Sequence, residues 1–276
     1  MTVFVSAYDL EAEPKRSLAA AAAVAAVHRK HDVPATFFVV ARLLEQAGPE
    51  YRRILDDELF DIECHSYSHP RLKPVHGQPA DQSEELLNRE ITLACDLIAD
   101  TFGRRPIGFT TPGGFTDGLR GERIVLRKLW DEGIRFVRSD ARGPNETIPA
   151  PLTQPYNYEA DGFPELWELP PHDWHDNVLT TQTDAGIPAA WPPVLPWGLP
   201  PRPPRDSLEW FDVYRKGVDW AGTHDLVHYM PTCHPWSLWG FDRCQGLDRL
   251  IGYVKGSGLE IVHCLELYRR LSGTTG

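Results

Sequence analysis

The chain has 276 residues, of which 42% are hydrophobic and 24% charged, a composition typical of a soluble globular protein and not of a disordered, collagen-like or coiled-coil chain. Its 28 lysines and arginines against 39 aspartates and glutamates give a formal net charge of −11, which argues against nucleic acid or an anionic membrane as a partner. The five cysteines form no CxxC pair, so we expect neither a disulfide framework nor a cysteine zinc site, and a reducing compartment is favoured.

The N-terminal segment predicts a protein that is not secreted. Residues 2–8 have the pattern of a strand, with no basic and apolar leader before them. The apolar run 18–27 is too short to span a bilayer and is expected to lie within an alanine-rich helix over 15–31. We therefore expect a cytoplasmic protein.

Strand and helix patterns alternate along the chain. Short apolar runs predict strands, and apolar residues at helical spacing predict helices, one of which has Ser83 as its cap and Gly103 as its end. The predicted strands cover residues 2–8, 35–40, 60–64, 107–110, 136–137, 165–169, 226–230 and 259–263. The predicted helices cover residues 15–31, 51–59, 83–102, 123–132, 247–255 and 265–271.

This alternation indicates an α/β fold with a parallel sheet. The number of strands and the chain length favour closure of the sheet into a barrel, which we expect to form a single domain over residues 1–276. In such barrels the active site lies at the C-terminal ends of the strands.

Residues 180–207 break the alternation. Eight prolines lie between Pro188 and Pro204, with Trp191 and Trp197 among them. Because proline has no amide hydrogen, this segment is expected to be neither a helix nor a central strand. We predict a long loop insertion, and its tryptophans favour an ordered lid or an interface over simple packing.

Two pairs of residues near strand ends could bind a metal ion. His65 and His69 are four residues apart, a spacing that would place both side chains on one face of a helix. Asp9 and Glu11 follow the first predicted strand, and carboxylates two residues apart on an extended segment point the same way. Taken singly, each pair is more often structural, either a chance spacing of histidines or a solvated acidic loop.

The two pairs together predict a metal centre. Two histidines and one carboxylate hold a divalent metal, for which zinc is the leading candidate, while a second carboxylate acts as general base. His234 follows a late strand and could protonate a leaving amine, although a histidine beside Trp236 in a tryptophan-rich turn is by itself more often a packing residue. A second histidine pair, His224 and His228, has the same spacing as the first.

These residues lie in an ordered set of motifs: YDLEAE at 8–13, VPATFFV at 33–39, HSYSH at 65–69, GFTTPGG at 108–114, WELPPHDW at 167–174 and CHPW at 233–236. By these motifs, which extend over most of residues 2–270, the chain resembles the polysaccharide deacetylase, or NodB-homology, family. It is most similar to the branch of intracellular peptidoglycan-deacetylase-like proteins, allantoinase-like enzymes and cyclic-imide hydrolases. The resemblance implies a distorted (β/α)7-type barrel and metal-assisted hydrolysis of an amide C–N bond.

The resemblance also implies a role for individual residues. Asp9 corresponds to the general base and His234 to the general acid, and the three metal ligands correspond to Glu11, His65 and His69. The residues that it implies in or near the substrate pocket are Thr110, Pro112, His172, Trp174 and Trp236.

Two positions depart from the family pattern. Glu11 stands where an aspartate is usual, so its carboxylate reaches about one bond further from the backbone. Thr110 stands where an arginine usually pairs with the base, and without that cation the pKa of Asp9 should rise. Arg138 and Arg142, after the next strand, are the candidates to replace it.

Two functional hypotheses follow. In the first, the protein is a metal-dependent hydrolase that removes an N-acyl group from an amino sugar or opens a small amide or imide. In the second, it is a catalytically altered barrel that binds a carbohydrate or another small ligand. In either case we expect the partner to be a small molecule or a sugar. The sequence leaves open whether the chain forms a homo-oligomer.

Overall fold

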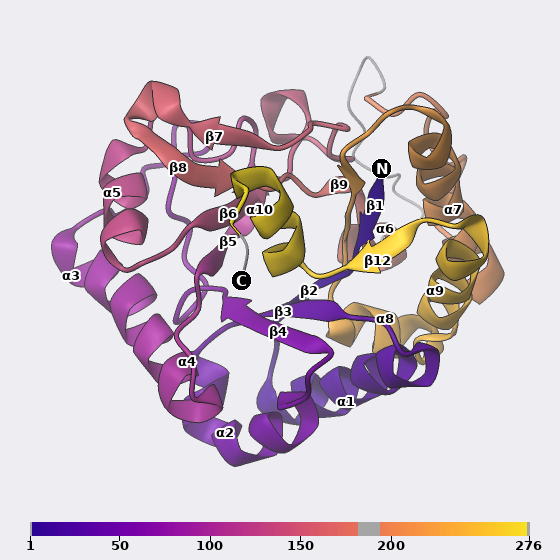
Figure 1. Cartoon of the computed structure of the whole chain (residues 1–276), viewed down its shortest axis with the longest axis horizontal. Helices are drawn as coiled ribbons and strands as arrows, with labels where there is room; N and C mark the ends of the chain where they lie inside the picture. The colour runs from indigo at the N-terminus through magenta and orange to yellow at the C-terminus, as the bar shows by residue number, and fades with distance from the viewer. Residues whose placement is uncertain (1, 182–193, 275–276) are drawn as a thin grey trace.

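Parallel strands with helices around them enclose the buried core of this protein (Figure 1). The computed structural model describes residues 2–181 and 194–274. The strands are β1 (Val3–Val5), β2 (Ala7–Leu10), β3 (Ala35–Val39), β4 (Phe60–Cys64), β5 (Gly108–Phe115), β6 (Phe136–Asp140), β7 (Tyr156–Tyr158), β8 (Phe163–Glu168), β9 (His172–His175), β10 (His228–Tyr229), β11 (Pro231–Thr232) and β12 (Glu260–Val262).

The helices lie on the outside of the strands (Figure 1). They are α1 (Pro14–His31), α2 (Arg42–Leu55), α3 (Glu84–Leu87), α4 (Ala94–Phe102), α5 (Arg123–Asp131), α6 (Asp176–Thr181), α7 (Ser207–Thr223), α8 (Pro235–Asp242), α9 (Gln245–Ser257) and α10 (Cys264–Ser272). A π-helix (Asn88–Leu93) joins α3 to α4, and two 3₁₀ turns (Pro144–Glu146 and Glu159–Asp161) flank β7.

The strands among the described residues form three sheets, in which almost all neighbours are parallel. The largest sheet has the order β2-β3-β4-β5-β6-β8-β7, in which β7 alone is antiparallel to its neighbour. Beyond β8 the chain continues into β9, which pairs in parallel with β11, and Cys233 just after β11 forms a parallel bridge with Tyr8 of β2. β1 pairs with both β10 and β12. These pairings, with β12 inserted beside β1, confirm the predicted distorted (β/α)7-type barrel.

The central strands β3 and β4 are buried over their whole length because both faces of the sheet are covered there. All five residues of β3 are buried, and so are all five of β4. The alanine-rich α1 contacts α2, α8 and α9, so that it joins the first and last parts of the chain on one side of the barrel. The short side chains of α1 allow this close approach of neighbouring helices.

Most predicted elements are present, with two differences in helix boundaries. α2 begins at Arg42 instead of residue 51, because the chain bends at Ala47 (φ −152°) and Pro49 then lies in the first turn of the second half, where its missing amide hydrogen is not needed. The helix predicted over 83–102 is interrupted by the π-helix. Ser83 does cap it, since its side chain accepts a hydrogen bond from the amide of Leu86 at 3.3 Å.

Part of the predicted loop insertion cannot be compared with the structure. Residues 182–193, which include Pro188 and Trp191, lie outside the described residues, so the lid stays a prediction. Residues 194–206 contain no helix or strand, and Trp197 packs against Trp220 of α7 with a ring-centroid distance of 6.2 Å. Within the two described ranges, no helix combines the length and apolar character needed to cross a bilayer.

Candidate metal centre and active site

The C-terminal ends of several strands bring polar side chains to one small cavity of about 100 Å³. This edge of a parallel barrel is where active sites lie in such folds. The side chains come from β2, β4, β5, β6, β9 and β11 and from the segments that follow them. The lining includes Asp9, Glu11, His65, His69, Thr110, Arg138, Arg142, His175 and His234.

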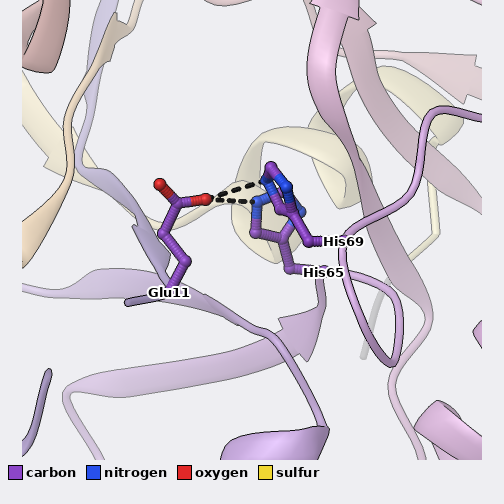
Figure 2. Close-up of side chains that lie close together, drawn as sticks. All are labelled: Glu11, His65 and His69. Carbon is purple, nitrogen blue, oxygen red and sulfur yellow. Dashed lines mark ion pairs between the residues drawn. The ribbon is translucent and has the colours of Figure 1, made fainter. Parts of the chain in front are cut away.

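Glu11, His65 and His69 converge at this cavity (Figure 2). The Nε2 atom of His69 lies 2.8 Å from Oε2 of Glu11, and Nε2 of His65 lies 3.5 Å from the same oxygen. One potential ligand atom from each residue falls within 4.8 Å of the other two. Among the described residues, only this trio forms such a group of metal-ligating side chains.

The two histidines meet without a helix, so the expectation of a helical pair is wrong. His65 follows β4 directly, and His69 lies in the loop beyond it. Positive φ angles at Ser66 (59°) and His69 (69°) turn the chain back on itself, and the Oγ atom of Ser66 accepts a hydrogen bond from the amide of His69 at 3.0 Å. The buried carboxylate of Glu90 also holds this loop through the amide of Ser68 at 2.7 Å.

The three side chains fit a divalent metal. Nδ1 of His65 lies 3.0 Å from the carbonyl oxygen of Thr110, which can only accept, so Nδ1 carries the proton and Nε2 keeps its lone pair. That Nε2 atom is buried and has no hydrogen-bond partner in the described part of the chain. Burial raises the pKa of Glu11, but the adjacent His65 and His69 outweigh this and hold the pKa well below its usual range. An ionised carboxylate and imidazole nitrogens are ligands that zinc favours.

Asp9 is held by an arginine from a different strand than the family pattern implies. Nη1 of Arg138 donates a hydrogen bond of 2.6 Å to Oδ1 of Asp9, and both side chains are buried. Thr110 pairs with Arg138 in the β5–β6 register, and its Oγ1 accepts from the same Nη1 at 3.0 Å. Burial raises the pKa of Asp9, but the charge of Arg138, together with the neighbouring His65 and His234, outweighs it and lowers the pKa. The pKa of Asp9 thus lies below its ordinary value although Thr110 offers no charge, and Arg138, one of the two candidates, supplies the cation.

The imidazole of His234 is hydrogen-bonded at Nδ1 to a carboxylate that the sequence motifs do not indicate. Its Nδ1 lies 2.6 Å from Oδ1 of Asp176, and its backbone amide donates to the same oxygen at 3.0 Å. Burial lowers the pKa of His234, but Asp176 outweighs it and, with Glu11 and Asp9, raises the pKa to about 9. Nε2 of His234 faces the cavity, 3.8 Å from Oδ2 of Asp9 and 3.9 Å from Oε1 of Glu11. The sequence offered no signal for this pair, whose members are 58 residues apart.

Asp176→Asn is expected to move the alkaline side of the pH–activity profile to lower pH. Asp176 is the main cause of the raised pKa of His234, so its loss lowers the pH at which the imidazolium gives up its proton. The measurement is the pH dependence of kcat/KM for wild type and variant. An unchanged alkaline side would contradict a role for Asp176 in keeping His234 protonated.

The predicted substrate-pocket residues are distributed differently from expectation. Thr110 lines the cavity, and Nε1 of Trp236 donates to Oε1 of Glu11 at 3.2 Å. Pro112 lies between lining residues but does not line the cavity itself. Trp174 and His172 do not line it either: Trp174 is packed in the hydrophobic core, and His172 is bonded to the carbonyl oxygen of Thr153 at 2.7 Å.

The neighbouring His175 of β9 lines the cavity instead. Burial of the large indole of Trp174 in the core gains more hydrophobic free energy than exposure in a pocket would. For this reason Trp174 lies in the core and not at the cavity, where the motif predicts it to contact substrate.

The second histidine pair is also structural. His224 stacks on Trp220 with a ring-centroid distance of 3.5 Å, and His228 is buried and bonded to the carbonyl oxygen of Pro170 at 2.8 Å.

Comparison with known proteins points to the family that the motifs resemble. Residues 15–124 match the family model of polysaccharide deacetylases. A crystal structure from Mycobacterium smegmatis, of a protein assigned to the polysaccharide deacetylases, is similar over 99% of this chain and 91% of its own, with a TM-score of 0.70 at 16% identity. The resemblance to the polysaccharide deacetylase family is confirmed.

Other structures with the polysaccharide deacetylase fold have different activities. PuuE allantoinase is similar over 94% of this chain and 74% of its own, with a TM-score of 0.66 at 16% identity. A mutant of a CE4-family pseudoenzyme from Bacillus anthracis, described as having restored enzymatic activity, is similar over 97% and 68%, with a TM-score of 0.55 at 16% identity. Identities this low establish the fold alone. No curated protein matches this chain significantly.

Proposed function

We propose that this protein is a metal-dependent hydrolase of a non-peptide amide C–N bond. The observation that carries the proposal is the buried Nε2 of His65, which has no hydrogen-bond partner within the described ranges and faces the carboxylate of Glu11 beside His69. A divalent metal would satisfy this lone pair. The base-like Asp9 and the acid-like His234 on the same cavity support hydrolysis as the chemistry.

A divalent metal held by Glu11, His65 and His69, with zinc as the first candidate, would polarise the substrate carbonyl and make water more acidic. Asp9 is the group that accepts the proton of the attacking water. Its low pKa keeps it ionised, and because Arg138 occupies Oδ1, the oxygen available for that proton is Oδ2. The hydroxyl oxygen bonds to the carbonyl carbon as the proton reaches Asp9.

His234 completes the reaction by protonating the leaving nitrogen. With a pKa of about 9, its imidazolium carries a proton at neutral pH, and its Nε2 faces the cavity. Transfer of that proton lets the C–N bond break with an amine as leaving group and a carboxylic acid as the other product. Asp176 stabilises the imidazolium before this step and fixes its orientation.

The size of the cavity favours a small reacting group. Its volume of about 100 Å³ is below the roughly 300 Å³ at which ordinary ligand pockets begin. A groove of about 550 Å³, which also contains Glu11 and His69, adjoins it and is lined by Val40, Arg42 and Leu43. An N-acylated amino sugar and a small amide or imide are therefore the two substrate classes in this proposal. We extend it to a cytoplasmic location, which the free and buried state of all five cysteines supports.

The second hypothesis, a barrel that binds a ligand without efficient hydrolysis, keeps one argument in its favour. A pseudoenzyme of the same fold exists, and in this chain Glu11 replaces the usual aspartate. The ion pair of Arg138 with Asp9 argues for the hydrolase, because an inactive barrel has no need of an ionised and oriented buried carboxylate.

Metal removal separates the two hypotheses. We expect the purified protein to hold about one divalent ion per chain. It should release acetate or ammonia from members of a panel of N-acetylated amino sugars and small amides and imides. This activity should be lost after chelation and regained with Zn²⁺. His65→Ala should abolish both metal binding and activity, whereas His224→Ala, which changes an exposed histidine outside the cavity, should affect neither. Absence of bound metal and of hydrolysis across the panel would favour the ligand-binding barrel.

A further inference from the structure

We infer that the cavity beside the metal centre binds an acidic group of the substrate, so that the natural substrate is a small amide that also carries a carboxylate. This inference rests on the proposed function and specifies its substrate class. It is based on two arginines, Arg142 and Arg138, that line the same cavity as the metal-ligating side chains and have nitrogens without a partner among the described residues.

The Arg142 guanidinium is hydrogen-bonded at Nε, whereas its two terminal nitrogens have no partner among the described residues. Its Nε donates a hydrogen bond of 2.9 Å to the carbonyl oxygen of Gly113, which holds the guanidinium plane. Its two terminal nitrogens make no hydrogen bond or ion pair with any described residue. The half-buried side chain thus offers the pair of parallel donors that a carboxylate accepts best.

Arg138 adds positive charge to the same cavity. One of its terminal nitrogens is engaged with Asp9, but Nε and Nη2 are buried and have no partner in the parts of the chain that the structure describes. The positive charge of this guanidinium acts on the cavity that Arg138 lines and favours an anionic group there. The side chain is only 2% exposed, so water screens this charge little.

The charges around Arg142 do not already neutralise it. Burial lowers the pKa of Arg142 and nearby Arg71 lowers it further, while Glu146 acts in the opposite direction without forming an ion pair. The carboxylate of Glu146 instead accepts a hydrogen bond from the amide of Thr116 at 3.0 Å. The negative groups of the cavity, Asp9 and Glu11, are engaged by Arg138 and by the histidines.

The side chains that line the cavity also suit an anionic group. Most of them are polar, and the carbon-only side chains among them are those of Ala141 and Val178. A carboxylate in this cavity would lie near two guanidinium groups, those of Arg138 and Arg142. Because the whole chain carries a formal charge of −11, this local preference for an anion has to come from the cavity itself.

Matched substrates test the inference. Succinamate is compared with neutral succinamide, and N-acetylglycine with neutral N-acetylglycinamide, so that the carboxylate is varied on the acyl side and on the amine side of the scissile bond. With the metal-loaded full chain, we expect kcat/KM to favour the acid in at least one pair by roughly ten- to a hundredfold, the range for one hydrogen-bonded charge. Arg142→Gln should reduce that preference about tenfold or more, and Arg127→Gln, which changes an exposed arginine on α5, should leave it unchanged.

A binding measurement keeps the test independent of turnover. Calorimetric titration of the full chain with succinamate should give a dissociation constant that rises about tenfold or more in Arg142→Gln. Equal kcat/KM values for acid and neutral partner in both pairs, or unchanged succinamate binding in the variant, would overturn the inference while the hydrolase proposal stands. Failure to hydrolyse any neutral or acidic amide would instead count against the proposed function, with the titration still deciding whether the cavity binds an acid.

Discussion

Replacement of Asp9 by asparagine is expected to lower kcat by roughly 10²- to 10⁴-fold, the usual contribution of a positioned general base. Asparagine has nearly the same shape and keeps an oxygen that can accept the hydrogen bond from Arg138, now 2.6 Å from Oδ1. It cannot take a proton from water at neutral pH. The measurement is kcat for a substrate found in the amide panel, with metal content determined in the same preparation.

Asp32→Asn provides the matched control for this substitution. Asp32 is an exposed residue at the end of α1 with a φ of 53°, a left-handed conformation that asparagine tolerates well. We expect this variant to keep wild-type activity. If Asp9→Asn retained its metal and folded structure and lost less than a few-fold in kcat, Asp9 would not be the general base.

Loss of Arg138 is expected to have the second largest effect. Arg138→Thr leaves the buried carboxylate of Asp9 without its cation, which should raise the pKa of Asp9, cost about 3–5 kcal/mol of stability and reduce kcat/KM roughly a hundredfold. Because the base must be ionised, the acidic side of the pH–activity profile should move to higher pH. Activity profiles and thermal denaturation curves measure the two effects separately.

An exchange of residues shows whether the position of this cation on β5 or β6 matters. Thr110 and Arg138 are partners in the β5–β6 register, and their side chains touch through Oγ1 and Nη1 at 3.0 Å. The double variant Thr110→Arg with Arg138→Thr returns the arginine to the strand where the family carries it. We expect it to recover at least about tenfold of the lost activity. A double variant no more active than Arg138→Thr, although equally folded, would contradict the exchange of one arginine for the other.

The barrel could be predicted largely from local patterns. The buried parallel strand 35–39 is a short, continuous apolar run, and the polar residues of the site lie at or just after the ends of its neighbours β2 and β4. The same logic led from Asp9, Glu11, His65 and His69 to one metal centre. It succeeded because parallel strands end at the same edge of the sheet, so that residues far apart in sequence meet there.

The parts that could not be predicted depend on tertiary packing. Asp176 supports His234 only because α6 and the start of α8 meet above β9 and β11, and no spacing in the sequence reveals that contact. The loop after β4 brings His65 and His69 together through two residues with left-handed backbone conformation. The i, i+4 spacing predicts that the two histidines meet, but it predicts a helix where the structure has a loop. Trp174, taken as a pocket residue from its motif, contributes to the core, where its large apolar area is best buried.

The most direct measurement is a crystal structure of the zinc-loaded protein with anomalous data collected on both sides of the zinc absorption edge. The account predicts a single strong anomalous peak in the cavity, about 2.0–2.2 Å from a carboxylate oxygen of Glu11 and from Nε2 of His65 and His69. No peak among these three side chains, or a peak held by other residues, would contradict the proposed metal centre and with it the hydrolase.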